Sequence, residues 1–151
     1  MAPQSDTQRI DPENTLHMTA PDRCCDLRKS RPLQTALAEF DTWITGRKHF
    51  HSGQRAQLPF FEDDGKGRLK VNPLIHWSAP DVNRYIEQHG LPRHPLVKRG
   101  YSSIGCTPCT TKTSASESIR AGRWRGIDKQ ECGIHFSGGK ALSANQPGEL
   151  Q

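Results

Sequence analysis

Apolar residues recur with helical spacing in the first third of the chain. They fall at i, i+3, i+4 and i+7 and are Leu33, Ala36, Leu37 and Phe40. This period places them on one face of a helix, so the pattern predicts a helix over residues 33–40. Pro32 stands directly before it, and a proline fits the first turn of a helix because the amide hydrogen that it lacks has no partner there.

A second helix is predicted to begin after Ser78. Asp81 follows Ser78 by three residues, a spacing similar to that of a capping box, in which two side chains cap the first turn. The positions that continue the pattern are Val82, Tyr85, Ile86 and His89. Gly90 follows where a glycine commonly ends a helix.

Three short apolar runs predict strands at 43–46, 58–61 and 69–71. The first run ends in a glycine and leads into a tight turn. The second and third are separated by residues 62–67, an acidic segment with glycines that is typical of a turn.

The distribution of polar residues divides the chain into three segments. Residues 1–20 are polar without a sustained period and are expected to form a poorly ordered lead-in. Residues 136–151 are polar too and are expected to form a mobile C-terminal tail. Residues 21–135 lie between them as the single folded part, and beyond Gly100 this part is expected to be mostly loop. The chain has no internal repeats.

Composition indicates a small hydrophobic core. The chain has 151 residues, 32% of them apolar, with a mean hydropathy of -0.79, and it contains eleven prolines and thirteen glycines. This length suits one domain, and the prolines and glycines favour short elements joined by loops. We therefore expect stability to depend on something besides burial, such as a metal centre or a partner.

The positive net charge of the chain favours one class of ligand. A formal charge of +5 favours anionic ligands such as nucleotides and sulfate esters. No polybasic run or RNA-binding signature occurs, so a nucleic-acid partner is not expected. No apolar stretch is long enough to span a bilayer, and the first nine residues lack the apolar run of a signal peptide. These features predict a cytoplasmic protein without a membrane partner, whose thiols stay reduced.

Four of the five cysteines form two pairs with metal-ligand spacing. Cys24 and Cys25 are adjacent, and Cys106 and Cys109 form a C-x-x-C. A C-x-x-C loop can place two thiolates on one metal centre, whereas the side chains of adjacent cysteines tend to diverge. This combination suits a [4Fe–4S] cluster better than Zn²⁺, whose sites usually have two paired knuckles. Zinc and four buried, unliganded thiols remain as alternatives.

Cys132 stands apart from these pairs, in the run E-C-G-I-H near the C-terminus. A reactive cysteine needs thiolate character, access and room to move. Gly133 gives mobility, and Arg123, Arg125 and Lys129 would favour both a thiolate and an anionic substrate. From these residues alone, a nucleophile and a fifth structural cysteine remain equally good interpretations.

Five blocks of sequence, taken together, resemble the C-terminal half of assimilatory adenylyl-sulfate (APS) reductases and their phosphoadenylyl-sulfate (PAPS) reductase relatives. The blocks are C-C-D-L-R-K at 24–29, W-I-T-G at 43–46, G-Y-S-S-I-G-C-T-P-C-T at 100–110, R-A-G-R-W at 120–124 and E-C-G-I-H at 131–135. The similarity runs from about Asp11 to His135. It implies an α/β fold: the loop-rich C-terminal part of a Rossmann-like adenine-nucleotide (PP-loop) fold, in a partial reductase domain over residues 21–135.

The resemblance implies a mechanism for Cys132. Its thiolate would attack the sulfur of adenosine 5′-phosphosulfate, AMP would leave, and an enzyme S-sulfocysteine would form. Thioredoxin, or a glutaredoxin-like reductant, would then release sulfite in a step akin to thiol–disulfide exchange. Cationic side chains must screen the approach of a thiolate to a doubly anionic substrate.

The resemblance also implies roles for the other site residues. Cys24, Cys25, Cys106 and Cys109 would bind the [4Fe–4S] cluster, and Lys29 would lie between cluster and substrate. The phosphosulfate and the rest of the substrate would be held by Arg47, Arg120, Arg123 and His135. The paired cysteines favour APS, because relatives without them use PAPS.

The full-length family has an earlier half with a phosphate-binding S-G-G-K-D-S loop, and this sequence does not contain that loop. Residues 137–140 share only its first four letters, without a strand before them or Asp-Ser after them, so we interpret them as coincidence. The chain is therefore expected to lack the N-terminal strands and the phosphate loop, and to act with a complementing half or as a homo-oligomer. A non-catalytic iron–sulfur or zinc-binding module remains the alternative.

Overall fold

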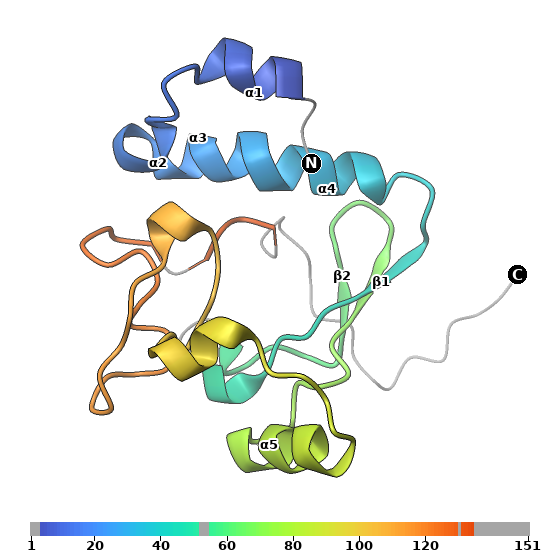
Figure 1. Ribbon diagram of the computed structural model, residues 1–151. Helices are drawn as coiled ribbons and strands as arrows, with labels where there is room; N and C mark the ends of the chain where they lie inside the picture. The colour runs from blue at the N-terminus through green and yellow to red at the C-terminus, as the bar shows by residue number, and fades with distance from the viewer. Residues whose placement is uncertain (1–3, 52–54, 130, 135–151) are drawn as a thin grey trace, which may run out of the picture.

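The protein is described by a computed structural model that covers residues 4–51, 55–129 and 131–134 (Figure 1). Its α-helices are α1 (Gln4–Ile10), α2 (Leu16–Thr19), α3 (Pro21–Cys25), α4 (Arg31–Ala36) and α5 (Ala79–Gln88). A π-helix, η1 (Asp26–Ser30), joins α3 to α4, and 3-10 turns η2 (His49–His51), η4 (Pro95–Arg99) and η5 (Thr107–Cys109) lie in the connections. The strands are β1 (Thr42–Ile44), β2 (Phe61–Asp63) and β3 (Leu69–Val71).

α3, η1 and α4 follow one another without a break and form a single helical rod over residues 21–36. The π turn ends two residues before Pro32, which has no backbone N–H to donate. The amide of Arg31 donates to the carbonyl of Asp26, an i to i−5 bond typical of a π turn. The predicted helix over 33–40 is therefore present, but it begins earlier and ends at Ala36.

Helices α1 and α2 lie in the N-terminal segment, where the sequence predicted a poorly ordered lead-in over residues 1–20. Asp11 explains the difference. Its buried carboxylate accepts the backbone amides of Thr15 (2.8 Å) and Leu16 (3.3 Å) at the start of α2. It also accepts Nη2 of Arg28 at 2.7 Å, which ties the N-terminal helices to the rod. This long-range ion pair has no signature in the local pattern.

The three strands form a small mixed sheet in the order β1-β3-β2. β3 is the central strand, parallel to β1 and antiparallel to β2. The strand predicted at 69–71 is confirmed, and those predicted at 43–46 and 58–61 are displaced to 42–44 and 61–63. Asp64 fixes the turn between β2 and β3, because its carboxylate accepts the backbone amides of Lys66 and Arg68 and the Nε of Arg68.

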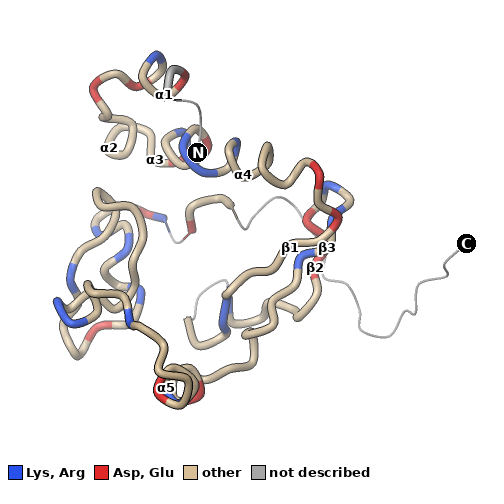
Figure 2. The backbone as a smooth tube through the Cα atoms, turned by 45° about the vertical axis from the view of Figure 1, so that its right-hand side comes forward, with Lys and Arg blue, Asp and Glu red and all other residues tan. Residues whose placement is uncertain are grey.

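The rod lies beyond the end of the sheet at which β2 turns into β3, and α5 lies beyond the opposite end (Figure 1). The capping box predicted for α5 is confirmed: Ser78 accepts the amide of Asp81, and Asp81 accepts the amide of Ser78. After α5 the chain is mostly loop, as expected, and Lys and Arg are spread along these loops (Figure 2). No helix of the described residues is both long and apolar enough to cross a membrane.

The apolar core is small. Among the described residues, the buried apolar side chains are Cys25, Leu27, Ile75, Trp124 and Cys132. Seven polar or charged residues are equally buried: Asp11, Thr45, Arg47, Arg55, Asp64, Lys70 and Asn72. Because cysteines form part of so small a core, the chemistry at these thiols bears directly on the stability of the fold.

Candidate functional site

The two cysteine pairs, 82 residues apart in sequence at Cys24 and Cys106, meet at one cavity of about 240 Å³. All four cysteines of the pairs line it, together with the cationic side chains of Arg28 and Lys29. The structure thus brings together the predicted metal ligands.

Each pair is positioned by a short element. Cys24 and Cys25 end α3, and Cys106 and Cys109 bracket η5, where the amide of Cys109 donates to the carbonyl of Cys106 at 2.9 Å. The carbonyl of Cys109 accepts the amide of Trp124 at 3.1 Å. These bonds hold the C-x-x-C loop against the segment that leads to Cys132.

Burial makes Cys25 and Cys109, one thiol of each pair, weaker acids. It raises the pKa of Cys25 to about 11, with Lys129 opposing the rise and the neighbouring sulfurs adding to it. Burial also raises the pKa of Cys109, and the charges of Cys106 and Cys24 add to this effect. Arg28 partly offsets the charge, because its Nη1 lies 3.6 Å from Sγ of Cys24. A bound metal centre would supply the rest of the positive charge.

A zinc site and an iron–sulfur site differ in how their ligands are spaced. A tetrahedral zinc site needs four ligands within about 2.3 Å of one ion. A [4Fe–4S] cube instead offers one iron at each of four corners, so its ligands stand farther apart around a cavity. Within the described part of the chain, no three or more His, Cys, Asp or Glu side chains form a group that could hold a metal ion. The four thiols line one cavity, and both the cluster and zinc stay predictions for it.

Cys132 lies beside this cavity. It is 7% exposed and packs in one cluster with Cys25 and Trp124, against which Cys109 and Ile134 also pack. All five cysteines are free thiols. The predicted nucleophile is therefore next to the predicted metal ligands, although more than twenty residues separate it from the nearer pair in sequence.

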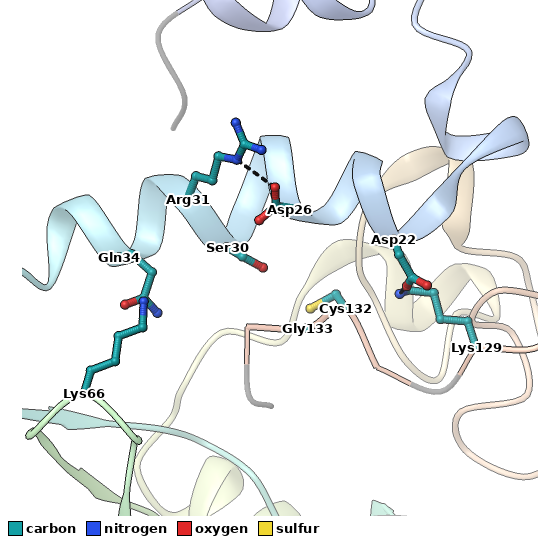
Figure 3. Close-up of a pocket in the computed structure, with 9 residues that line it drawn as sticks. All are labelled: Asp22, Asp26, Ser30, Arg31, Gln34, Lys66, Lys129, Cys132 and Gly133. Atoms are coloured by element: carbon teal, nitrogen blue, oxygen red, sulfur yellow. Dashed lines mark hydrogen bonds and ion pairs between the residues drawn. The ribbon is translucent and has the colours of Figure 1, made fainter. Parts of the chain in front are cut away.

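Cys132 also lines a second, larger pocket of about 560 Å³ (Figure 3). The rod supplies one side of this pocket with Asp22, Asp26, Ser30, Arg31 and Gln34. Lys66, from the turn between β2 and β3, points towards the rod, and Lys129 pairs with Asp22. The Cys132 sulfur thus faces a pocket with three cationic side chains and two carboxylates.

Glu131, the residue before Cys132, is held by two arginines. Nε and Nη2 of Arg55 donate to both oxygens of its carboxylate, the second at 2.9 Å, and Nη2 of Arg120 lies 3.2 Å from Oε1. Burial raises the pKa of Glu131, but the hydrogen bond and charge of Arg55, with Arg120 and Arg123, outweigh it and lower the pKa. Nη1 of Arg55 also donates to Nδ1 of His51 at 3.2 Å. We call these four residues, Arg55, Arg120, Glu131 and His51, the arginine network.

Two of the arginines predicted to bind substrate are engaged inside the protein. Arg47 is 1% exposed; it pairs with Glu62 and donates to Oδ1 of Asn72, while its Nη1 has no hydrogen-bond partner among the described residues. Arg123 stacks on Trp124 at 4.3 Å and donates to the carbonyl of Ile104.

The structure therefore does not gather the predicted substrate residues around the pocket that contains Cys132. Lys29 lines the cysteine cavity, Arg120 belongs to the arginine network, and Arg47 and Arg123 have internal contacts. His135 lies outside the described residues. The substrate roles of these five residues stay predictions. Sequence reasoning missed Arg55 and Lys66, which belong to no recognisable motif, and it assigned no role to the rod side chains that line this pocket, although Asp26 lies in the quoted block at 24–29.

Comparison with known proteins identifies the family. The phosphoadenosine phosphosulfate reductase domain matches residues 2–112. The chain belongs to this family. It is 50% identical over 130 residues to the adenosine 5′-phosphosulfate reductase of Mesorhizobium japonicum, covering 86% of this chain and 51% of that protein. It is 44% identical over 133 residues to that of a Chelativorans species, covering 88% and 54%.

A solved structure of this reductase family supports the fold. The phosphate complex of the PAPS reductase from Candida auris matches with a TM-score of 0.58 and 28% identity, over 74% of this chain and 53% of that one. The predicted family and the predicted α/β, Rossmann-like fold class are confirmed. The chain spans about half the length of the relatives that it matches.

Proposed function

We propose that this chain carries the reacting thiol of a thioredoxin-dependent adenosine 5′-phosphosulfate reductase, and that Cys132 is that thiol. The proposal depends on one observation: Cys132 packs against Cys25, and all four paired cysteines line the adjoining cavity. The names of the curated relatives support this reaction class. Because those relatives are about twice as long, we assign turnover to an assembly that includes the remaining half, whether a complementing segment or further copies of the chain.

In the first half-reaction the Cys132 thiolate attacks the sulfur of the phosphosulfate. An S–S bond forms, the bond between that sulfur and the bridging oxygen breaks, and AMP leaves with the electron pair. Lys129 and Lys66 border the pocket in which the sulfate group would lie, and their charges offset the repulsion between thiolate and substrate.

In the second half-reaction a thioredoxin-like or glutaredoxin-like dithiol supplies two electrons. Its first thiolate attacks Sγ of the S-sulfocysteine, sulfite leaves, and a mixed disulfide remains. Its second thiol resolves this disulfide and returns Cys132 to the thiolate. The five free cysteines are consistent with a reducing compartment such as the cytoplasm.

We further propose that Cys24, Cys25, Cys106 and Cys109 bind a [4Fe–4S] cluster. When bound, the cluster supplies structural support and positive charge beside the reacting thiol. Arg28 and Lys29 border the same cavity and balance the charge of the four thiolates.

Sulfite release from APS with thioredoxin, measured anaerobically on the assembled protein, tests the nucleophile. Cys132→Ser should abolish release while the protein keeps its iron. Retention of full activity by Cys132→Ser would refute the proposal. A Cys24→Ser variant should instead lose both iron and activity.

The choice between APS and PAPS needs its own measurement, because the matched crystal structure is of a PAPS reductase whereas the curated relatives are APS reductases. We propose APS. Turnover with each nucleotide at equal concentration should favour APS, and a higher kcat/KM for PAPS would reverse the assignment.

A further inference from the structure

The N-terminal segment supplies part of the wall of the cysteine cavity. Asn14 and His17 line this cavity together with the four paired cysteines. Asn14 has a φ of 54°, in the left-handed region that asparagine adopts more readily than most residues. Its carbonyl oxygen lies 2.8 Å from Nδ1 of His17. The segment that the sequence predicted to be a poorly ordered lead-in therefore surrounds the proposed metal site in part.

Asp11 joins this wall to the rod. Its side chain is 3% exposed, and its carboxylate accepts the backbone amides of Thr15 and Leu16 at the start of α2. The same carboxylate accepts Nη2 of Arg28, whose side chain is 24% exposed, at 2.7 Å. Because water screens a mostly buried pair much less than an exposed one, this contact links the N-terminal helices firmly to the rod.

Arg28 extends this link to the cavity itself. Its Nη2 donates to Oδ2 of Asp11 and, at 2.9 Å, to Oδ1 of Asn14. Its Nη1 donates to Sγ of Cys24 at 3.6 Å. A guanidinium group is planar and rigid, so two acceptors on one nitrogen determine where the other nitrogen points. The position of the positive charge beside Cys24 is therefore set by two side chains that precede α2.

We propose that Asp11 is a positioning residue for the cysteine cavity. Through Arg28 it keeps a positive charge against Cys24, and retention of a metal centre thus depends on the contact between the N-terminal segment and the rod. Contacts of this kind, made to the ligands of a metal and not to the metal, commonly change metal affinity by a factor of about 10–100. The inference rests on the proposed function, because it takes the cavity to be the metal site.

The first test measures iron retention by the anaerobically reconstituted full chain. An excess of chelator is added, and the loss of visible absorption is followed with time. Asp11→Asn should lose iron about tenfold faster than the wild type. The asparagine oxygen can still accept the amides of Thr15 and Leu16, because asparagine is a preferred capping residue, so this change breaks the ion pair and keeps the start of α2.

Asp6→Asn is the matched control. Asp6 also lies in the N-terminal segment, but it pairs with Arg9 at 3.5 Å in an exposed contact. This variant should lose iron at the wild-type rate. Faster loss in Asp6→Asn, equal to that in Asp11→Asn, would show that any acidic residue of the segment has the effect.

A double variant tests whether Asp11 acts through Arg28. Arg28→Gln alone should accelerate iron loss at least as much as Asp11→Asn does. Combining the two changes should then give no further acceleration, because both remove the same contact. Single effects that multiply in the double variant would show that Asp11 acts independently of Arg28, which would overturn the inference.

A second readout reports the charge beside Cys24 without any metal. In the metal-free full chain, alkylation of Cys24 by the anion iodoacetate is compared with alkylation by neutral iodoacetamide, using mass spectrometry with fragmentation to distinguish Cys24 from Cys25. Both reagents react with the same thiolate, so the ratio of their rates reports the local positive charge. Asp11→Asn should lower this ratio several-fold, because Arg28 is no longer held in place. Removal of the Asp11 charge alone would raise the ratio.

An unchanged or raised ratio in Asp11→Asn would overturn the inference, since a merely loosened cavity admits both reagents equally. If Asp11→Asn does not fold, Asn14→Gly removes the other acceptor of Nη2 and keeps the left-handed backbone conformation. It should act in the same direction, with a smaller effect. A wild-type chain that holds no iron would refute the proposed cluster, and the alkylation ratio would still decide the role of Asp11.

Discussion

The cysteine cavity and the arginine network both adjoin Cys132, and they differ in how their charges are balanced. In the arginine network each buried cation has a partner from the same chain, as Arg55 has in Glu131. In the cysteine cavity four thiols line one space, and the cations at its border are Arg28 and Lys29. The network therefore forms without a ligand, whereas the cavity is where we propose that a metal centre binds. Four measurements test this contrast.

The largest effect is expected from loss of the metal centre. Anaerobic reconstitution should load about four irons and matching labile sulfide per chain. Cys106→Ser should remove most of the iron and the visible absorption, and should lower Tm by about 10 °C or more, because the thiols occupy much of a small core. Cys132→Ser, the matched control, should keep its iron. One zinc per chain without sulfide would contradict the cluster.

A buried ion pair should show the next largest effect. Arg47→Ala removes the closer of the two cations paired with the mostly buried Glu62, leaving Lys70 at 3.8 Å, and should cost up to about 3–5 kcal/mol in the free energy of unfolding. Arg31→Ala breaks the exposed pair with Asp26 and should cost less than about 1 kcal/mol. Urea unfolding of both variants measures the difference. Equal costs would show that burial does not set the strength of these pairs.

The pH dependence of stability should reveal His51 in the arginine network. Burial, with the charges of Lys48, Arg55 and Arg120, lowers the pKa of His51 from 6.5 to about 4. The unfolded state therefore binds more protons between these values, so stability should fall as the pH decreases from 6.5 to 4, by up to about 3 kcal/mol.

His51→Gln should flatten this part of the stability profile, and urea unfolding across the pH range measures it. His89→Gln, at an exposed position, should leave the slope of the wild type unchanged. An unchanged slope in His51→Gln would show that His51 does not titrate in this way.

The smallest effect is expected far from both regions. Ser78→Ala removes one half of the capping box of α5 and should cost about 1 kcal/mol. Ser116→Ala, an exposed loop serine, serves as the control. Iron content should stay at the wild-type value in both. A loss of iron in Ser78→Ala would mean that α5 supports the cysteine cavity.

Local sequence patterns predicted those elements that are stabilised by contacts between residues close in sequence. Ser78 and Asp81 are three residues apart and cap α5 as predicted, and the strand at 69–71 is confirmed. The cysteine spacing predicted one shared cavity because a metal site requires convergence of its ligands. The family resemblance supplied the Rossmann-like fold class, which three short strands could not have shown.

Local sequence patterns did not predict the long-range contacts. Arg55 and Glu131 are 76 residues apart, and neither arginine spacing nor charge count pairs them. The resemblance implied substrate roles for Arg47 and Arg120, which stay predictions, but it did not indicate their ion pairs with Glu62 and Glu131. The π turn was not predicted either. A proline at position 32 is compatible both with the start of a helix and with a place inside the longer rod, so the sequence does not distinguish the two.

The rod over residues 21–36 forms a wall common to the cysteine cavity and the Cys132 pocket. Cys24 and Lys29 face one, while Ser30 and Gln34 face the other. A displacement of this one element alters both spaces together. A coupling free energy between two sites is reciprocal. If a metal bound in the cavity changes the affinity of the pocket for a nucleotide by some factor, the nucleotide changes the affinity of the cavity for the metal by the same factor.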